Sequence, residues 1–312
     1  MANTFPTANP NDAGGQAIPQ NASGTFIPQI WSTKLLTKFY LKTVYSEISN
    51  TDYEGEIKNH GDEVIIREHA DIAISDYVKG GGLNYENPSH GTTNLLIDQG
   101  HYFAFNLYDV DRVQTDLNLM DDWSSDGAEK MRIKVDSNVL GTIYAQAATE
   151  NAGAAAGKIS ADINLGTTAA PKALSNANII DWLIDLSVVM DEQNLPDSDR
   201  FVVLPAKACA RIKTSELKDA SMTGDGKSTL RNGKVGMVDR ITIYQSNNVN
   251  VAAGKYDIVF GHKCATTFAG QITKMESLKN PNDFGDLARS LFVYGFKVIK
   301  PDALGHSVVT VA

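Results

Sequence analysis

One segment of the sequence has residue types and a spacing that could bind a phosphate group. Residues 221–228, SMTGDGKS, resemble a glycine-rich phosphate-binding loop, in which backbone N–H groups would hold the phosphates and Lys227 would reach the terminal one. Ser221 replaces the first glycine of that motif, and the preceding KTSELKDA favours a helix where the motif requires a buried strand. We therefore interpret the segment as a turn with an exposed lysine. A nucleotide-binding enzyme remains the weaker alternative.

Other side chains capable of chemistry do not form a recognisable site. The three acidic pairs lack the glycine and the terminal glutamate of a calcium-binding loop; they are Asp109 with Asp111, Asp121 with Asp122, and Asp197 with Asp199. His262 and Cys264 have no second metal-ligating pair nearby, and glycines 80–82 lack the spacing of a dinucleotide-binding turn. The sequence has neither a GxSxG nor an HExxH motif. We predict no catalytic residue, no metal site and no cofactor, and hence a protein that is not an enzyme.

Composition narrows the class of protein further. The net charge of −9 over 312 residues and a pI near 5.1 argue against a general nucleic-acid binder, because such affinity comes mainly from Lys and Arg. Cys209 and Cys264 are the only cysteines, which suits a reducing cytoplasm. The N-terminus lacks the pattern of a signal peptide, and no run of about 18 apolar residues occurs. We expect a soluble protein with no membrane partner.

Residues 52–111 predict one extended β-hairpin with a polar, glycine-rich tip. The outgoing arm places Val64, Ile65 and Ile66 among charged residues and is too polar for a core strand. In the return arm, alternation puts apolar residues on one face and two tyrosines on the other: Leu95, Ile97, Phe103, Phe105 and Leu107 against Tyr102 and Tyr108. A hairpin this long is marginally stable alone, so we expect another copy of the chain to cover it.

The remaining elements flank this hairpin. Residues 1–24 can bury little and predict an arm that orders on contact, and the apolar residues that follow Pro28 predict a short amphipathic helix that pins it to the body. Residues 119–148 predict a long helix, and residues 149–174 a surface connection between two lobes. A helix, a buried FVVLP strand and a second helix then indicate an α/β lobe, followed by late strands that could return to the long helix.

This order of parts resembles the major capsid protein of tailed bacteriophages. The resemblance extends from about residue 26 to 309 and is strongest in five stretches: FIPQIWS, DYEGEIKNHGDEVIIREHADIAISDY, LLIDQGHYFAFNLYDVDR, LRNGKVGMVDRITIYQSNNV and LFVYGFKVIKPDAL. It implies an α+β fold of the Hong Kong 97 type with five parts. These are an N-terminal arm with a short helix (1–50), an extended β-hairpin loop (51–114), a peripheral domain with a spine helix and connection (115–172), an axial α/β domain (173–255), and a return to the peripheral domain (256–312).

The resemblance also implies function and partners. It implies self-assembly into pentamers and hexamers of an icosahedral shell around double-stranded DNA. The implied partners are scaffolding, portal and possibly decoration proteins. The protein would be assembled in the host cytoplasm and be located in the virion. We predict intersubunit contacts at Phe26, Trp31, Ile72, Ile74, Tyr77, Lys79, Gly80, Gly81, Gly82 and Tyr85. The alternatives are a tail component or a shell-forming nanocompartment.

Some relatives cross-link a loop lysine to an asparagine of a neighbouring subunit. The matching residues here would be Lys79 and either Asn280 or Asn282. An exposed lysine beside glycines is ordinary, so we expect denaturing gels of shells to show monomers.

Overall fold

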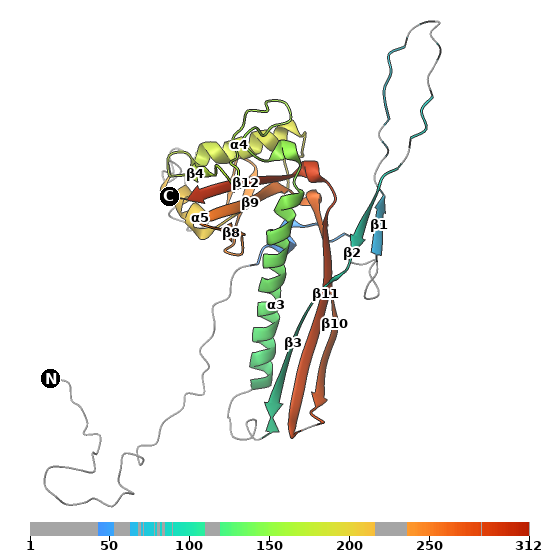
Figure 1. The fold of residues 1–312 in the computed structure, drawn as a ribbon, viewed down its shortest axis with the longest axis vertical. Coiled ribbons are helices and arrows are strands. Elements are labelled where there is room, and N and C mark those ends of the chain that lie inside the picture. Colours follow the sequence, from blue (N-terminus) through green and yellow to red (C-terminus); the bar gives the residue numbers. More distant parts are fainter. Residues whose placement is uncertain are drawn as a thin grey trace, which may run out of the picture.

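The computed structural model describes most of the chain. It covers residues 43–52, 63–67, 90–109, 119–215, 236–281 and 283–311, together with 70, 72–77, 79, 82 and 85–88; the side chains of 271–275 are excepted. Two bodies stand out in Figure 1: a rounded lobe, and a long, narrow body in which a helix lies beside a sheet.

Seven strands form the central sheet of the rounded lobe, which we call the α/β lobe. Their order is β4-β12-β9-β5-β7-β6, with β8 paired to β9. All five residues of β5 are buried, so both faces of the sheet are covered there. The apolar faces of α4 (Ile179–Glu192) and α5 (Ala206–Thr214) share one hydrophobic core with the sheet. The strands are β4 (Lys172–Leu174), β5 (Arg200–Leu204), β6 (Met237–Val238), β7 (Ile241–Gln245), β8 (Val251–Ala252), β9 (Lys255–His262) and β12 (Leu304–Val311).

The narrow body consists of α3 (Leu119–Ile143) and a three-stranded antiparallel sheet, which we call the long sheet. Its order is β10-β11-β3, and the strands are β3 (Gln99–Tyr108), β10 (Thr266–Lys279) and β11 (Gly285–Val298). The helix lies along one face of this sheet (Figure 1). Asn138 of α3 donates a hydrogen bond to the Tyr294 hydroxyl of β11 at 2.8 Å. The prediction that late strands return to the long helix is confirmed for β10 and β11.

The predicted single hairpin is only partly correct. β1 (Glu63–Arg67) pairs antiparallel with β2 (Thr92–Leu96), as expected, and Tyr102 and Tyr108 are exposed. The predicted apolar residues do not share one face, because Leu95 and Ile97 pack with Val293 of β11 whereas Phe103 and Phe105 face α3. The rest of the return arm, β3, instead pairs along its whole length with β11. Alternation fixes which face of a strand is buried but not which strand is its partner, and this is why the prediction failed.

Two other expectations need correction. Residues 149–174 were expected to form a surface connection, but Ala156, Leu165 and Leu174 are fully buried in the core of the α/β lobe. Residues 256–312 were assigned to the peripheral domain, yet β9 and β12 belong to the seven-stranded sheet. The chain therefore crosses between the two bodies more often than the five predicted parts imply.

The helix predictions hold with shorter limits. The long helix ends as an α-helix at Ile143 and continues as the 3-10 turn Tyr144–Gln146, whereas the prediction extended to 148. The helix before Pro196 ends at Glu192, and the strand FVVLP is β5. The helix beginning after Pro205 is α5, and its predicted continuation beyond Ser215 lies outside the described residues. Within the described residues, no helix is long and apolar enough to cross a membrane.

A buried carboxylate joins three distant parts of the chain. Asp136 of α3 is fully buried; its Oδ1 accepts hydrogen bonds at 2.9 Å from the backbone N–H groups of Val44 and Tyr45, at the start of α1 (Tyr45–Ile48). Its Oδ2 accepts one at 2.6 Å from the side chain of Asn248 in the α/β lobe. Just after α1, Asn50 exchanges backbone hydrogen bonds with Thr266 and Phe268 of β10, each 2.8 Å long. Residues 43–50 are thus fixed at both ends.

Candidate intersubunit surface

The segment between β1 and β2, residues 68–91, carries most of the predicted contact residues. We call this segment the loop. It projects away from both bodies (Figure 1). Ile74 is 99% exposed and Tyr85 86% exposed, and Ile72 and Tyr77 are also exposed. Such large apolar side chains held in water gain nothing from folding of the isolated chain.

The two limbs of the loop are joined by a hydrogen bond. The backbone N–H of Ala73 donates to the Glu86 carboxylate at 2.8 Å. Lys79 is exposed, and Gly82 has a φ of +75°, a conformation that favours glycine. Four predicted contact residues lie outside the described residues: Phe26, Trp31, Gly80 and Gly81.

The base of the loop, in contrast, is anchored. The inner faces of β1 and β2 pack on the side of the long sheet opposite α3, in a small core of six buried residues: Val64, Ile66, Leu95, Ile97, Ala269 and Val293. A Cβ at Gly295 of β11 would lie 2.1 Å from the Leu96 carbonyl oxygen, so only glycine lets β2 approach this closely. The outer residues Ile65 and Leu96 remain exposed. The loop therefore extends from a fixed platform.

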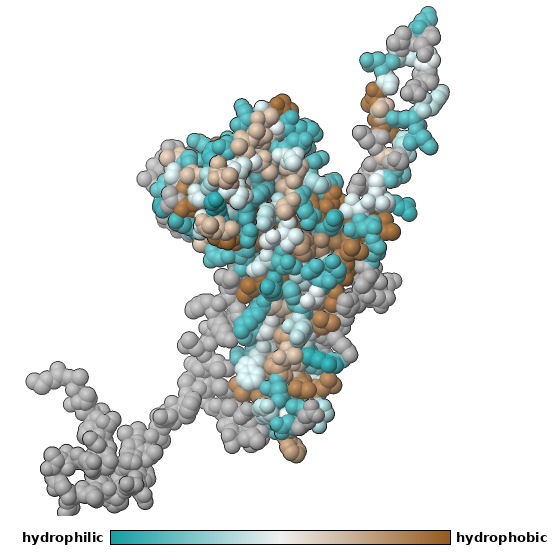
Figure 2. Space-filling view, in the orientation of Figure 1, coloured by the Kyte–Doolittle hydropathy of each residue, from teal (hydrophilic) through white to brown (hydrophobic). Residues whose placement is uncertain are grey.

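A second exposed apolar group, which sequence reasoning did not select, lies at the far end of the long sheet. Phe284, in the turn between β10 and β11, is 83% exposed, and Tyr108 and Leu278 are also exposed. Figure 2 shows hydrophobic atoms on the loop, at its base and at this far end. The available signal was an aromatic residue in the otherwise polar turn NPNDFGD.

Ion pairs accompany this second group. Arg289 pairs with Glu276, and the Lys279 ammonium lies 2.6 Å from the Asp286 carboxylate. Both pairs join directly opposite residues of β10 and β11, a spacing that favours opposite charges. Because they are largely exposed, they add specificity more than stability.

The residues considered for chemistry have structural roles where the structure describes them. His262 Nδ1 accepts a hydrogen bond from the Cys264 backbone N–H at 3.1 Å, and burial lowers the pKa of His262. Asp197 pairs with Arg200 and Arg240. No group of three or more potential metal ligands occurs among the described residues. Burial raises the pKa of the Cys209 thiol to about 11, so it stays protonated and unreactive near neutral pH.

Other candidates are only partly described. Asp121 and Asp122 lie in the first turn of α3, where carboxylates favour the helix dipole. Segment 221–228 and Asp111 fall outside the described residues. The geometry presents contact surfaces, with an exposed loop at one end and an exposed sheet tip at the other.

Comparison with known proteins identifies the class to which this architecture belongs. Residues 95–306 match a family model described as phage capsid protein, and this chain belongs to that family. Among curated protein sequences, none matches the chain.

Solved structures give the fold in more detail. A structure from Mycobacterium phage Che8 is 25% identical, with a TM-score of 0.73, covering 90% of this chain and 96% of that one. The capsid structure of cyanophage P-SCSP1u is 16% identical, with a TM-score of 0.67, covering 92% and 94%. A structure from Gordonia phage Cozz is 14% identical, with a TM-score of 0.65, covering 98% of both chains. The predicted phage capsid family and the mixed α+β fold are confirmed, and the fold is consistent with the Hong Kong 97 type.

Proposed function

We propose that this structural capsid protein assembles into pentamers and hexamers of an icosahedral shell that encloses double-stranded DNA in the virion. The observation that carries the proposal is the loop: an anchored base supports a projecting segment whose large apolar side chains are exposed, Ile74 almost fully. A neighbouring copy would bury Ile72, Ile74, Tyr77 and Tyr85 at a favourable ~25 cal/mol per Å² of apolar surface.

The other predicted contact residues would add to this contact between the loop and a neighbouring copy. Lys79 and the glycines at 80–82 would allow the tip to adapt to the neighbour, and Phe26 and Trp31 would add contacts from the N-terminal segment. The exposed tip of the long sheet, around Phe284, provides a second surface on which copies could meet.

Charge is consistent with a container for DNA. With a net charge of −9, the chain as a whole would not hold DNA by general attraction, which leaves packaged DNA free to be released. Scaffolding and portal proteins, and possibly decoration proteins, would be the other partners, with assembly in the host cytoplasm. Denaturing gels should show monomers, since we expect no cross-link from Lys79.

Expression of the chain alone, followed by electron microscopy, tests the proposal. Closed shells are expected when the chain is concentrated, alone or with its scaffolding protein. Tubes would indicate a tail component, and discrete monomers under both conditions would contradict shell assembly.

A deletion tests the loop specifically. Residues 72–88 can be removed while 68–71 and 89–91 close the hairpin, since Arg67 and Thr92 are paired. We expect the deleted chain to fold and to lose shell formation. Shells of normal shape from this variant would show that the loop is not required to hold neighbouring copies together. Ile74→Asp should also weaken shell formation, as the deletion does. Ile74→Val, which keeps the apolar surface, is the matched control and should still form shells.

A further inference from the structure

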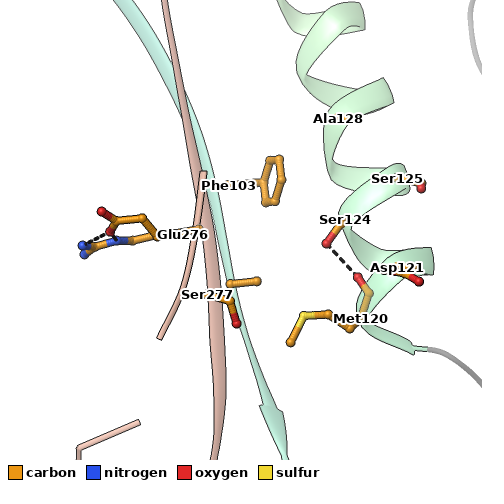
Figure 3. Close-up of a pocket in the computed structure, with 10 residues that line it drawn as sticks. Phe103, Met120, Asp121, Ser124, Ser125, Ala128, Glu276 and Ser277 are labelled. Atoms are coloured by element: carbon orange, nitrogen blue, oxygen red, sulfur yellow. Dashed lines mark hydrogen bonds and ion pairs between the residues drawn. The ribbon is translucent and has the colours of Figure 1, made fainter. Parts of the chain in front are cut away.

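A groove between α3 and the long sheet remains open in the described part of the structure. Its wider part, about 500 Å³, lies beside the first turns of α3. Its lining includes the apolar Phe103, Met120, Ala128 and Ala288 and the charged Asp121, Glu276 and Arg289. Figure 3 shows Phe103 projecting from the sheet into this space, with Met120 and Ser124 on the opposite wall. A narrower part, about 230 Å³, shares Phe103 and Ala128 and continues to Tyr45, Val135 and Phe292. The groove therefore runs from the first turn of α3 to the start of α1.

The groove exists because small residues separate the helix from the sheet. A Cβ at Gly127 would lie 3.0 Å from the Phe103 ring, so the helix backbone rests directly on that ring. Beside this contact, Ala128 and Ala288 are too short to fill the space between the two layers, and Ala128 remains exposed although it lines the groove. Unfilled apolar space of this kind forgoes packing energy.

The segment that precedes α1 ends at the mouth of the groove. The described chain begins at Thr43, two residues before the groove-lining Tyr45, and 42 residues precede it. Residues 28–42 follow Pro28 with apolar residues at helical spacing. As a helix they would measure about 22 Å, and the stretch of α3 from Met120 to Val135 that borders the groove is also about 22 Å long.

The composition of this segment also suits the groove. At 100° per residue, Leu36, Phe39 and Tyr40 fall on one face of the helix. The only charged residues, Lys34, Lys38 and Lys42, fall on the opposite side, which also carries Trp31 and Leu41. The apolar face would meet the apolar part of the lining, around Phe103, Ala128 and Phe292. The lysines would face solvent.

We propose that residues 28–42 form an amphipathic helix that binds in the groove of its own chain, parallel to α3, with Leu36, Phe39 and Tyr40 inserted between α3 and the long sheet. Since the Val44 N–H is bonded to Asp136, Leu36, eight residues before Val44, comes level with Ala128, eight residues before Asp136. Docking of this segment does not depend on shell assembly, because both partners belong to one chain.

Disulfide trapping tests the proposal in the unassembled full-length chain. The variant L36C/A128C, in a Cys264→Ser background with buried Cys209 retained, should form a bond within one chain in most molecules under mild oxidation. Mass spectrometry of the linked peptides and non-reducing gels measure this. The control L36C/S137C should stay reduced, because Ser137 lies on the opposite face of α3 from Ala128. No bond in L36C/A128C, an equal yield in the control, or a bond only between chains would overturn the proposal.

Hydrogen exchange gives a second measurement that does not require cysteines. Amides of residues 28–42 should exchange at least about tenfold more slowly than in an unfolded chain, a protection that reports a stable local structure. Ala128→Glu places a charge in the groove and should abolish this protection, whereas Ser137→Glu should not. Protection that survives Ala128→Glu would exclude this groove as the binding site.

Discussion

The α/β lobe and the loop represent opposite ways of using apolar residues. In the lobe, Trp182, Phe201 and Phe260 are buried in a core contributed by strands and helices from distant parts of the chain. In the loop, Ile74 and Tyr85 are held in solvent by a hydrogen-bonded pair of limbs. The lobe is stabilised by its own contacts, whereas the apolar surface of the loop contributes energy only when another molecule covers it. Mutations in the core of the lobe should therefore impair folding, whereas mutations in the loop should impair assembly.

The largest loss of stability is expected from the core of the α/β lobe. Trp182 is fully buried, and its Nε1 donates a hydrogen bond to Ser307 Oγ at 3.3 Å. Trp182→Ala should lower the free energy of unfolding of the unassembled chain by about 3–5 kcal/mol, measured by urea denaturation. Trp182→Phe should cost less because it retains most of the volume.

A smaller loss is expected at the junction between the two bodies. Asp136→Ala would leave the N–H groups of Val44 and Tyr45 and the Asn248 amide without their buried acceptor. We expect a loss of about 3 kcal/mol and faster hydrogen exchange in residues 43–48. Asp136→Asn keeps the shape and one acceptor and should lose less. Equal stability of wild type and Asp136→Ala would show that these bonds contribute little.

Acid should weaken an ion-pair network at the edge of the α/β lobe. Partial burial raises the pKa of Asp191, but hydrogen bonds and charges from Arg200 and Arg240 outweigh it and hold this pKa below its ordinary value of 3.8. The stabilisation is present above pH 3.8 and disappears as the pH falls through the lower folded-state pKa. The difference in unfolding free energy between wild type and Asp191→Asn should therefore shrink below that pH. A constant difference down to the acid transition would contradict this linkage.

The smallest effect on stability is expected in the loop. Ile74→Asp should change the unfolding free energy of the unassembled chain by no more than about 0.5 kcal/mol, because Ile74 is 99% exposed. The same variant should impair assembly. A destabilisation comparable to that of Trp182→Ala would break the distinction between the two regions.

Local patterns were sufficient to predict some elements. Alternation along residues 99–108 predicted both a strand and its buried face, and helical spacing predicted α3 and α4. The pairing of β3 with β11 could not be predicted, because it joins residues nearly two hundred positions apart through backbone bonds that side-chain patterns do not specify. The polar, glycine-rich composition of the segment between β1 and β2 was sufficient to predict that this segment is exposed.

Asp136 was missed for a related reason. It stands in the sequence beside the apolar Val135, within the predicted helix 119–148, where a carboxylate resembles an ordinary surface charge. Its partners Val44 and Asn248 lie 92 and 112 residues away, so its burial depends on tertiary contacts that helical periodicity does not show.

The double attachment of residues 43–50 has a mechanical consequence. Asp136 holds the start of this segment to α3, and the backbone of Asn50 holds its end to β10. Tension from the N-terminal segment would enter the protein at the helix, and tension from the residues that follow Asn50 would enter at the strand. Two neighbouring subunits pulling on these two ends would therefore load separate parts of the fold.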